Sequence, residues 1–288
     1  MPRIALNLAY VGTGYRGWQT QTDGQSLQDD LELALAKIAL EPVRVVCAGR
    51  TDADVHALSQ VVHFDTRAVR PLRAWVKGVN RCLAEHYEQV RRGGFGRMMI
   101  REAEETTTSF HARFSAIART YYYVIYNDKD WHPHWIDRSG FYYRPLCLEA
   151  MKEAASHLIG RHDFSSFRAA QCQATSPVRS VHAITINAYR PLILVKVKAD
   201  GFLHHMIRNM VGALLAIGCG DEPPIRMRHW LMAAERSLLP PTFAAGGLYF
   251  AGANYAPDAL SFQTVSSVNE ILPAGSLVSA RLHDQSET

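Results

Sequence analysis

The segment of this chain richest in reactive side chains is 49–57, which reads Gly-Arg-Thr-Asp-Ala-Asp-Val-His-Ala between two apolar, strand-like runs. It brings the guanidinium of Arg50, the carboxylate of Asp52 and the imidazole of His56 within a few residues of one another. A carboxylate can form and then release a covalent bond, and a loop on a rigid scaffold can hold it in place. Asp is also a common turn residue, but a solvated turn needs no guanidinium beside its carboxylate. Asp52 is therefore a candidate nucleophile.

A second group of side chains with possible function is the aromatic run 119–123, Arg-Thr-Tyr-Tyr-Tyr. Strand alternation places Tyr121 and Tyr123 on one face and Tyr122 on the other. One face can pack in the core while the other offers a platform on which a nucleic acid base stacks. The alternative is that the three tyrosines reflect strand propensity and packing alone.

The third group is 201–209, Gly-Phe-Leu-His-His-Met-Ile-Arg-Asn, where a strand end opens into an apolar helix. Arg208 lies among apolar residues, so it should lie near the core and need a carboxylate partner, for which Asp52 is our candidate. His204 and His205 suggest metal ligands, but adjacent helical residues point about 100° apart and no metalloprotease-like His-Glu-x-x-His motif accompanies them. No metal site is predicted.

Basic residues recur at helical spacing in Arg73, Lys77 and Arg81, and a second basic run follows them. Each set can be a solvated face, but together they favour a polyanionic partner. The net charge is only +4, so we infer a polyanionic partner from where the basic residues lie and not from the total charge.

Composition places the chain among ordinary globular proteins, with 288 residues of which 48% are hydrophobic. The longest apolar runs fall far short of the ~20 residues that a membrane span requires. The N-terminus enters a strand at once without the features of a secretory leader, so we expect a cytoplasmic protein. Five scattered cysteines without a Cys-x-x-Cys pair suggest reduced, mostly buried thiols.

Hydrophobic periodicity divides the chain into two similar halves, each read as βαββαβ. In the first half we expect strands at 3–10, 42–48 and 58–64 with helices at 26–40 and 72–82. In the second we expect strands at 119–126, 178–188, 192–199 and 247–254 with helices at 148–159 and 204–217.

This order predicts an α+β (mixed α/β) fold of two ferredoxin-like or RRM-like βαββαβ subdomains side by side, with their sheets forming a central RNA-binding cleft. The expected boundaries are 1–113 for the subdomain with the nucleophile loop, 114–256 for the second subdomain and 257–288 for a loosely ordered tail.

Several motifs, in this order and spacing, resemble the tRNA pseudouridine synthase A family from Arg3 to about Tyr255. They are Tyr-x-Gly-x-x-Tyr-x-Gly-Trp-Gln-x-Gln at 10–21, the 49–57 loop, Phe-His-Ala-Arg-Phe-Ser-Ala at 110–116, the 119–123 run, Gly-Arg-His-Asp-Phe-Ser-Ser-Phe-Arg at 160–168 and Phe-Leu-His-His-Met-Ile-Arg-Asn-Met-Val-Gly at 202–212.

The resemblance implies isomerisation of uridine to pseudouridine at positions 38, 39 and 40 in the anticodon stem-loop of tRNA, by a homodimer without cofactor or essential metal. It makes Asp52 the nucleophile, Tyr121 the residue that stacks on the target base and Arg208 the partner of the aspartate. The expected substrate-binding residues are Arg50, His56 and Phe202, together with the basic residues Arg73, Lys77 and Arg81.

The chain departs from the family pattern at Asp54, where the family normally has glycine, and in the segment 81–109. A glycine there indicates a positive φ or a close approach of the RNA backbone, and Asp54 is a second possible carboxylate partner for Arg208. The segment contains Gly93-Gly94-Phe95-Gly96, expected as a flexible loop.

Two other functions remain open from sequence alone. A non-catalytic tRNA-binding or RNA-folding protein would use the same fold and basic residues without turnover. A metal-dependent hydrolase would use His56, His111, His204 and His205.

Overall fold

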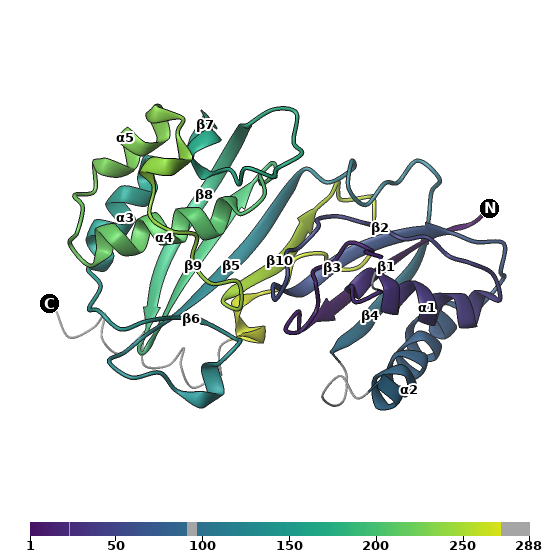
Figure 1. The fold of residues 1–288 in the computed structure, drawn as a ribbon. Helices are drawn as coiled ribbons and strands as arrows, with labels where there is room; N and C mark the ends of the chain where they lie inside the picture. Colours follow the sequence, from purple (N-terminus) through teal and green to yellow (C-terminus); the bar gives the residue numbers. More distant parts are fainter. Residues whose placement is uncertain (23, 91–96, 272–288) are drawn as a thin grey trace, which may run out of the picture. The chain divides into compact units, whose positions relative to one another are not determined.

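The computed structural model describes residues 1–22, 24–90 and 97–271, which form two compact units (Figure 1). Among the described residues, the first unit comprises Met1–Arg119 and Tyr249–Ser266, and the second comprises Thr120–Leu248 with 267–271. The first unit is thus built from two stretches far apart in the sequence. The expected boundaries at residues 113 and 256 stay predictions of domain organisation.

The first unit is a sheet with two helices on one face (Figure 1). Its strand order is β4-β1-β3-β10, and β2 also pairs with β3. β1 is antiparallel to β3 and β4, whereas β10 runs parallel to β3. The elements are β1 (Arg3–Tyr10), α1 (Leu27–Ala39), β2 (Val46–Cys47), β3 (His56–Asp65), the π-helical turn η1 (Ala74–Gly78), α2 (Val79–Val90), β4 (Met98–Thr106) and β10 (Leu248–Asn254).

Helix α1 begins and ends close to where the sequence predicts. Ser26 caps its N-terminus in a capping box with Asp29, and Leu40 ends it in the left-handed conformation with φ of 59°. Leu27, Leu31 and Leu35 are fully buried, as their helical spacing predicts.

The second predicted helix of this unit is wrong in extent, because it runs from η1 through α2 to Val90 rather than ending at Cys82. The apolar stripe continues at four-residue steps through Trp75, Val79, Leu83 and Tyr87, all at most 2% exposed. Strand β4 follows and is the last strand of the predicted βαββαβ order, for which no bounds could be predicted because acidic residues interrupt the apolar pattern along it. The predicted Gly93–Gly96 loop lies outside the described residues.

The second unit is a sheet in the order β5-β9-β8-β7 with helices on one face, and β6 pairs with β5 (Figure 1). Its elements are β5 (Ala118–Asn127, which begins in the first unit), β6 (Gly140–Tyr142), α3 (Leu148–Ser156), β7 (Gly160–Asp163), β8 (Val178–Tyr189), β9 (Leu192–Ala199), α4 (Met206–Gly218) and α5 (Arg226–Ala233). Short helical turns lie at η2 (Pro133–Trp135), η3 (Ser165–Phe167), η4 (Arg236–Leu238) and η5 (Val268–Glu270).

In the second unit α3 packs against α4 and against β8, and β8 pairs with β9. Val195, Val197 and Met210 are at most 1% exposed, so the apolar residues of β9 and α4 point inward as their periods predict. The short β6 and β7 and the helix α5 were not predicted, because segments of this length carry little periodicity.

The mixed α/β class predicted from the sequence is confirmed. The finer description, two ferredoxin-like or RRM-like subdomains with a central RNA-binding cleft, stays a prediction. Residues 257–266, expected to be loosely held, contribute the buried side chains of Leu260 and Phe262 to the first unit.

The five cysteines are free thiols, as expected. Only Cys47 is buried, however, and Cys147 is exposed, so the expectation that most are buried is wrong. Within the described part of the chain, no helix has the length and apolar character needed to cross a membrane.

Candidate active site

Residues 49–55, which contain the predicted nucleophile Asp52 and which we therefore call the nucleophile loop, join β2 to β3 in the first unit. Asp52 is half-buried within it, Arg50 is exposed and Thr51 is only 7% exposed. The loop therefore combines an accessible cation, a partly desolvated carboxylate and a buried neighbour that anchors the backbone between them.

Hydrogen bonds from β1 and β3 hold the start of the nucleophile loop. The Tyr10 hydroxyl lies 2.8 Å from Thr51 Oγ1. Gln60 Nε2 donates to the carbonyl of Gly49 at 2.6 Å, and Gln60 Oε1 accepts from the Gly49 N–H at 3.4 Å. Because Tyr10 and Gln60 are buried strand residues, the loop is fixed to the rigid part of the unit.

The glycine-rich segment after β1 packs directly against the nucleophile loop, backbone to backbone. A Cβ atom on Gly12 would lie 2.0 Å from the carbonyl oxygen of Val55, and one on Gly17 would lie 2.8 Å from that of Thr51. The N–H of Trp18 donates to the same Thr51 carbonyl at 3.0 Å. Glycine is therefore required at 12 and 17 by close approach.

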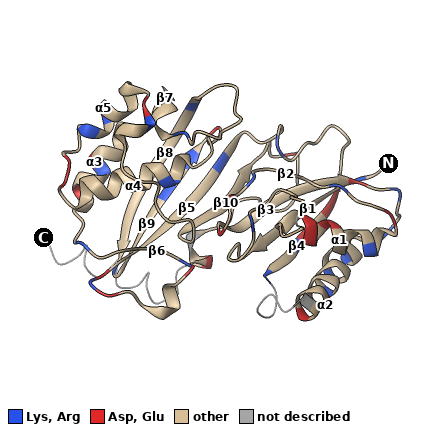
Figure 2. Cartoon of the chain, viewed as in Figure 1, with Lys and Arg blue, Asp and Glu red and all other residues tan. Residues whose placement is uncertain are grey.

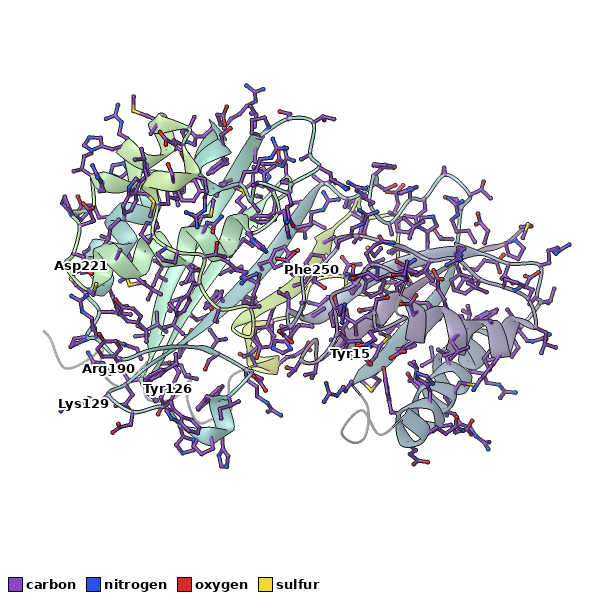
Figure 3. All side chains as sticks on the ribbon, in the orientation of Figure 1. Tyr15, Tyr126, Lys129, Arg190, Asp221 and Phe250 are labelled. Carbon is purple, nitrogen blue, oxygen red and sulfur yellow. The ribbon has the colours of Figure 1, made fainter. Side chains whose placement is uncertain are left out.

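Tyr15, labelled in Figure 3, belongs to this glycine-rich segment and forms a hydrogen bond to α1. Its hydroxyl donates to Asp30 Oδ2 at 2.7 Å, and His86 Nε2 on α2 lies 3.1 Å from Asp30 Oδ1. Burial raises the pKa of Tyr15 well above its usual value, so the hydroxyl keeps its proton and remains a donor.

Asp54 has φ of 63°, which confirms the positive φ predicted for this position. Its Oδ1 atom accepts a hydrogen bond from the N–H of Gly14 at 3.0 Å. The carboxylate thus links the nucleophile loop to the glycine-rich segment, a contact that glycine at 54 could not make.

His56, predicted to bind substrate, is 2% exposed at the start of β3. Its Nδ1 accepts the N–H of Gly12 at 3.1 Å, and its ring centroid lies 4.7 Å from that of Tyr249 on β10. These contacts make His56 a residue that holds the glycine-rich segment against the end of the nucleophile loop.

In the second unit, Tyr121 on β5 is 8% exposed, and its ring meets that of Phe202 at a centroid distance of 5.1 Å and an angle of 80°. This edge-to-face packing fixes the plane of the tyrosine ring. The sequence motifs that contain these two residues therefore meet in space.

Arg208 is half-buried on α4, where the sequence predicts it. Its Nε donates to the carbonyl of Phe243 at 2.9 Å, and the N–H of Phe243 donates back to the Arg208 carbonyl at 3.3 Å. A Cβ atom on Gly212 would lie 2.5 Å from the carbonyl oxygen of Pro241. The segment 241–243 thus lies against α4 and orients the Arg208 side chain.

The predicted basic residues Arg73, Lys77 and Arg81 are exposed along η1 and α2. Arg81 pairs with Glu85 at 2.9 Å, and acidic positions also occur on α1 and α2 (Figure 2). This face therefore carries charges of both signs.

Sequence reasoning gave no roles to Tyr10, Gly12, Gly17 and Trp18, although it recognised the motif that contains them. The spacing of its glycines was the available signal. The 160–168 motif is largely structural, since Phe164 and Phe167 are fully buried and Ser166 Oγ donates to the Trp230 carbonyl at 2.6 Å.

Comparison with known proteins gives consistent matches. A family model described as tRNA pseudouridine synthase matches residues 154–256. A tRNA pseudouridine synthase A from Bordetella petrii is 46% identical over 260 residues, covering 90% of this chain and 93% of the relative. Proteins of the same name from Herminiimonas arsenicoxydans and Dechloromonas aromatica are 45% and 46% identical over 255 residues each, covering 88% of this chain and 90% and 93% of their own lengths.

Proposed function

The chain belongs to the tRNA pseudouridine synthase A family, and we propose that it converts uridines 38, 39 and 40 of the tRNA anticodon stem-loop to pseudouridine with Asp52 as the nucleophile. The observation that carries the proposal is the position of Asp52. It is half-buried in a loop whose backbone is held on both sides by buried residues and close glycine contacts.

The reaction is an isomerisation, so the substrate and the product contain the same atoms. The bond between N1 of uracil and C1′ of the ribose breaks, and a bond between C5 and C1′ forms. The proton on C5 leaves to solvent, and N1 gains one. The Asp52 carboxylate forms a transient bond to the nucleotide and is released unchanged, as a nucleophilic catalyst must be.

We further propose that Tyr121 stacks on the target base and that Arg208 pairs with the Asp52 carboxylate. An aromatic face returns ~1 to 3 kcal/mol of the cost of unstacking a base. A guanidinium partner favours the charged form of a carboxylate once RNA excludes water. The edge-to-face contact with Phe202 supports the first role by fixing the ring of Tyr121.

The wider RNA contacts that we propose involve Arg50, Phe202 and the basic residues of η1 and α2, with His56 acting through the backbone that it holds. The basic residues of η1 and α2 are Arg73, Lys77 and Arg81, all of which are exposed. We also propose that the protein works in the cytoplasm as a homodimer and needs no metal. Light scattering that gives a monomer mass at assay concentration would contradict the dimer.

The test is release of tritium from tRNA transcripts labelled at C5 of uridine, with EDTA present. Isomerisation must free this hydrogen, so we expect release by the wild type and none by Asp52→Asn. Asp54→Asn is a matched control, because it removes a nearby carboxylate charge while keeping a hydrogen-bond acceptor, and it should release tritium. Mapping the modified positions in the product tests the assignment to 38, 39 and 40.

Failure of this test would favour the non-catalytic alternative. No release by wild type, together with intact binding of the same tRNA, would indicate an RNA-binding protein. Release abolished by EDTA and restored by a divalent metal would instead contradict the proposal that no metal is needed.

A further inference from the structure

An exposed aromatic stack lies in the first unit, formed by residues to which the proposed function gives no role. Phe114, in the loop between β4 and β5, is 76% exposed. The ring of His111 stacks on it with a centroid distance of 4.3 Å and an angle of 27°, and Cζ of Arg113 lies 5.6 Å from the Phe114 centroid. We call these three residues the Phe114 stack.

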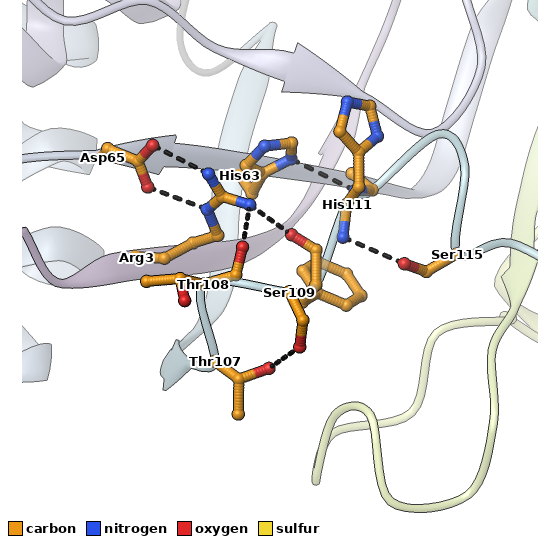
Figure 4. A network of polar contacts seen from close by, with 10 residues as sticks. Arg3, His63, Asp65, Thr107, Thr108, Ser109, His111 and Ser115 are labelled. Atoms are coloured by element: carbon orange, nitrogen blue, oxygen red, sulfur yellow. Dashed lines mark hydrogen bonds and ion pairs between the residues drawn. The ribbon is translucent and has the colours of Figure 1, made fainter.

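Hydrogen bonds fix the backbone that carries this stack. His111 Nδ1 accepts the N–H groups of Arg113 at 3.2 Å and Phe114 at 3.1 Å. The N–H of His111 donates to Ser115 Oγ at 2.9 Å (Figure 4). Burial and the charges of Arg3 and Arg113 lower the pKa of His111, which keeps its ring neutral and able to accept.

A second layer anchors the loop to the sheet (Figure 4). Arg3 forms a two-pronged ion pair with Asp65 at 2.7 and 2.8 Å and also donates to the carbonyls of Thr108 and Phe110 at 2.8 and 2.6 Å. His63 Nδ1 accepts the N–H of Ala112 at 3.1 Å. An exposed Phe on a loop anchored this firmly loses little conformational entropy on binding.

The Phe114 stack is also tied to the nucleophile loop within the same unit. Nη2 of Arg119 donates both to the carbonyl of Arg113 and to that of Ala48, the latter at 3.3 Å. Ala48 immediately precedes the nucleophile loop. Arg50 and Arg113 both act to lower the pKa of the Cys47 thiol, which burial nevertheless raises to about 12, so both guanidinium groups lie near this residue.

We propose that the Phe114 stack binds an unpaired base of the tRNA, next to the base that reacts at Asp52. Every nucleobase offers a π-face to a rigid aromatic ring, and the adjacent guanidinium of Arg113 adds attraction for the phosphate backbone. The arrangement of an exposed ring backed by a second ring and flanked by a cation fits a single-stranded nucleic acid better than an apolar protein surface. The proposal rests on the proposed function in taking tRNA as the ligand.

The test measures the dissociation constant of an unmodified tRNA transcript at several salt concentrations. Phe114→Ala should weaken binding about 5- to 150-fold, the range of ~1 to 3 kcal/mol per stacked base, with an unchanged salt slope. Phe114→Trp should bind within twofold of wild type. Arg113→Gln should reduce the magnitude of the salt slope by about 0.7 to 0.9.

Ile117→Ala is the matched control, because Ile117 is an apolar side chain of the same loop, 61% exposed, but has no π-face. It should bind tRNA like the wild type. Equal binding by Phe114→Ala and wild type would overturn the proposal, as would equal weakening by Phe114→Ala, Phe114→Trp and Ile117→Ala. A change of molecular mass on Phe114→Ala in light scattering would assign the surface to a second copy of the chain and also overturn it.

Tritium release separates this proposal from the proposed function. If wild type releases tritium while Phe114→Ala binds tRNA normally, only the stacking proposal fails. If wild type releases none while Phe114→Ala weakens binding of the transcript, only the proposed function fails.

Discussion

The Asp54 carboxylate accepts a hydrogen bond of 3.0 Å from the backbone N–H of Gly14, and the Asp54 backbone has φ of 63°. The sequence resemblance placed glycine at this position, and the φ value explains that preference. The Asp54 side chain offsets the conformational cost by joining the nucleophile loop to the glycine-rich segment that packs against it.

Substitution of Asp54 should separate the cost of its positive φ from the contribution of its hydrogen bond to Gly14. Asp54→Ala keeps the unfavourable φ and loses the hydrogen bond, so we expect a loss of about 1 to 2 kcal/mol in the free energy of unfolding and reduced tritium release. Asp54→Gly loses the bond but adopts the φ easily, so it should be the more stable of the two. Urea denaturation measures the free energy of unfolding of both variants. An alanine variant as stable as the glycine variant would contradict this prediction.

Substitution of Gly12 should displace the nucleophile loop. In Gly12→Ala the new methyl group would collide with the carbonyl oxygen of Val55, so either segment must shift. A shift of about 1 Å can cost ~100-fold in rate, and overpacking costs ~1 to 3 kcal/mol of stability. Single-turnover tritium release measures the first effect. Gly24→Ala is the control: it has φ of 62° with open space around it, so it should keep full activity despite some strain.

Removal of the Tyr10 hydroxyl should weaken the anchor of Thr51. Tyr10→Phe leaves a buried Thr51 hydroxyl without its 2.8 Å partner, which should cost ~1 to 3 kcal/mol in unfolding free energy. A double-mutant cycle with Thr51→Val measures the coupling of the two side chains. A coupling energy near zero would show that the hydroxyl contact does not stabilise the loop.

The protein should lose stability as the pH falls from about 6.5 to 4, because of His63. Burial, with the nearby charges of Arg3 and His111, lowers the pKa of His63 to about 4, against ~6.5 in an unfolded chain. Between about pH 4 and 6.5, His63 is protonated in the unfolded state but neutral in the folded state. The free energy of unfolding is therefore highest above about pH 6.5 and decreases as the pH falls.

At pH 4.5 the expected loss from His63 is about 2 to 3 kcal/mol. His63→Gln keeps an acceptor for the Ala112 N–H but does not titrate in this range. Urea denaturation at pH 7.0, 5.5 and 4.5 should therefore give a shallower pH dependence for this variant than for wild type. Parallel curves would exclude His63 as the source.

Local elements could be predicted because their signals lie within a few residues. The capping box at Ser26 and the leucine spacing of α1 defined that helix, and strand alternation defined β1 and β9. The helix that ends at Val90 is longer than predicted, because the apolar stripe that begins at Trp75 continues through Leu83 to Tyr87.

The sequence by itself determined which residue types could react, since the grouping of Arg50, Asp52 and Thr51 is a property of one short segment. Only the tertiary structure decided how that segment is held. The approach of Gly12 to Val55, the parallel pairing of β10 with β3 and the link from Arg113 through Arg119 to Ala48 join residues distant along the chain. The physical reason is that periodicity and capping report interactions between near neighbours, whereas backbone contact between distant segments depends on how the whole unit packs.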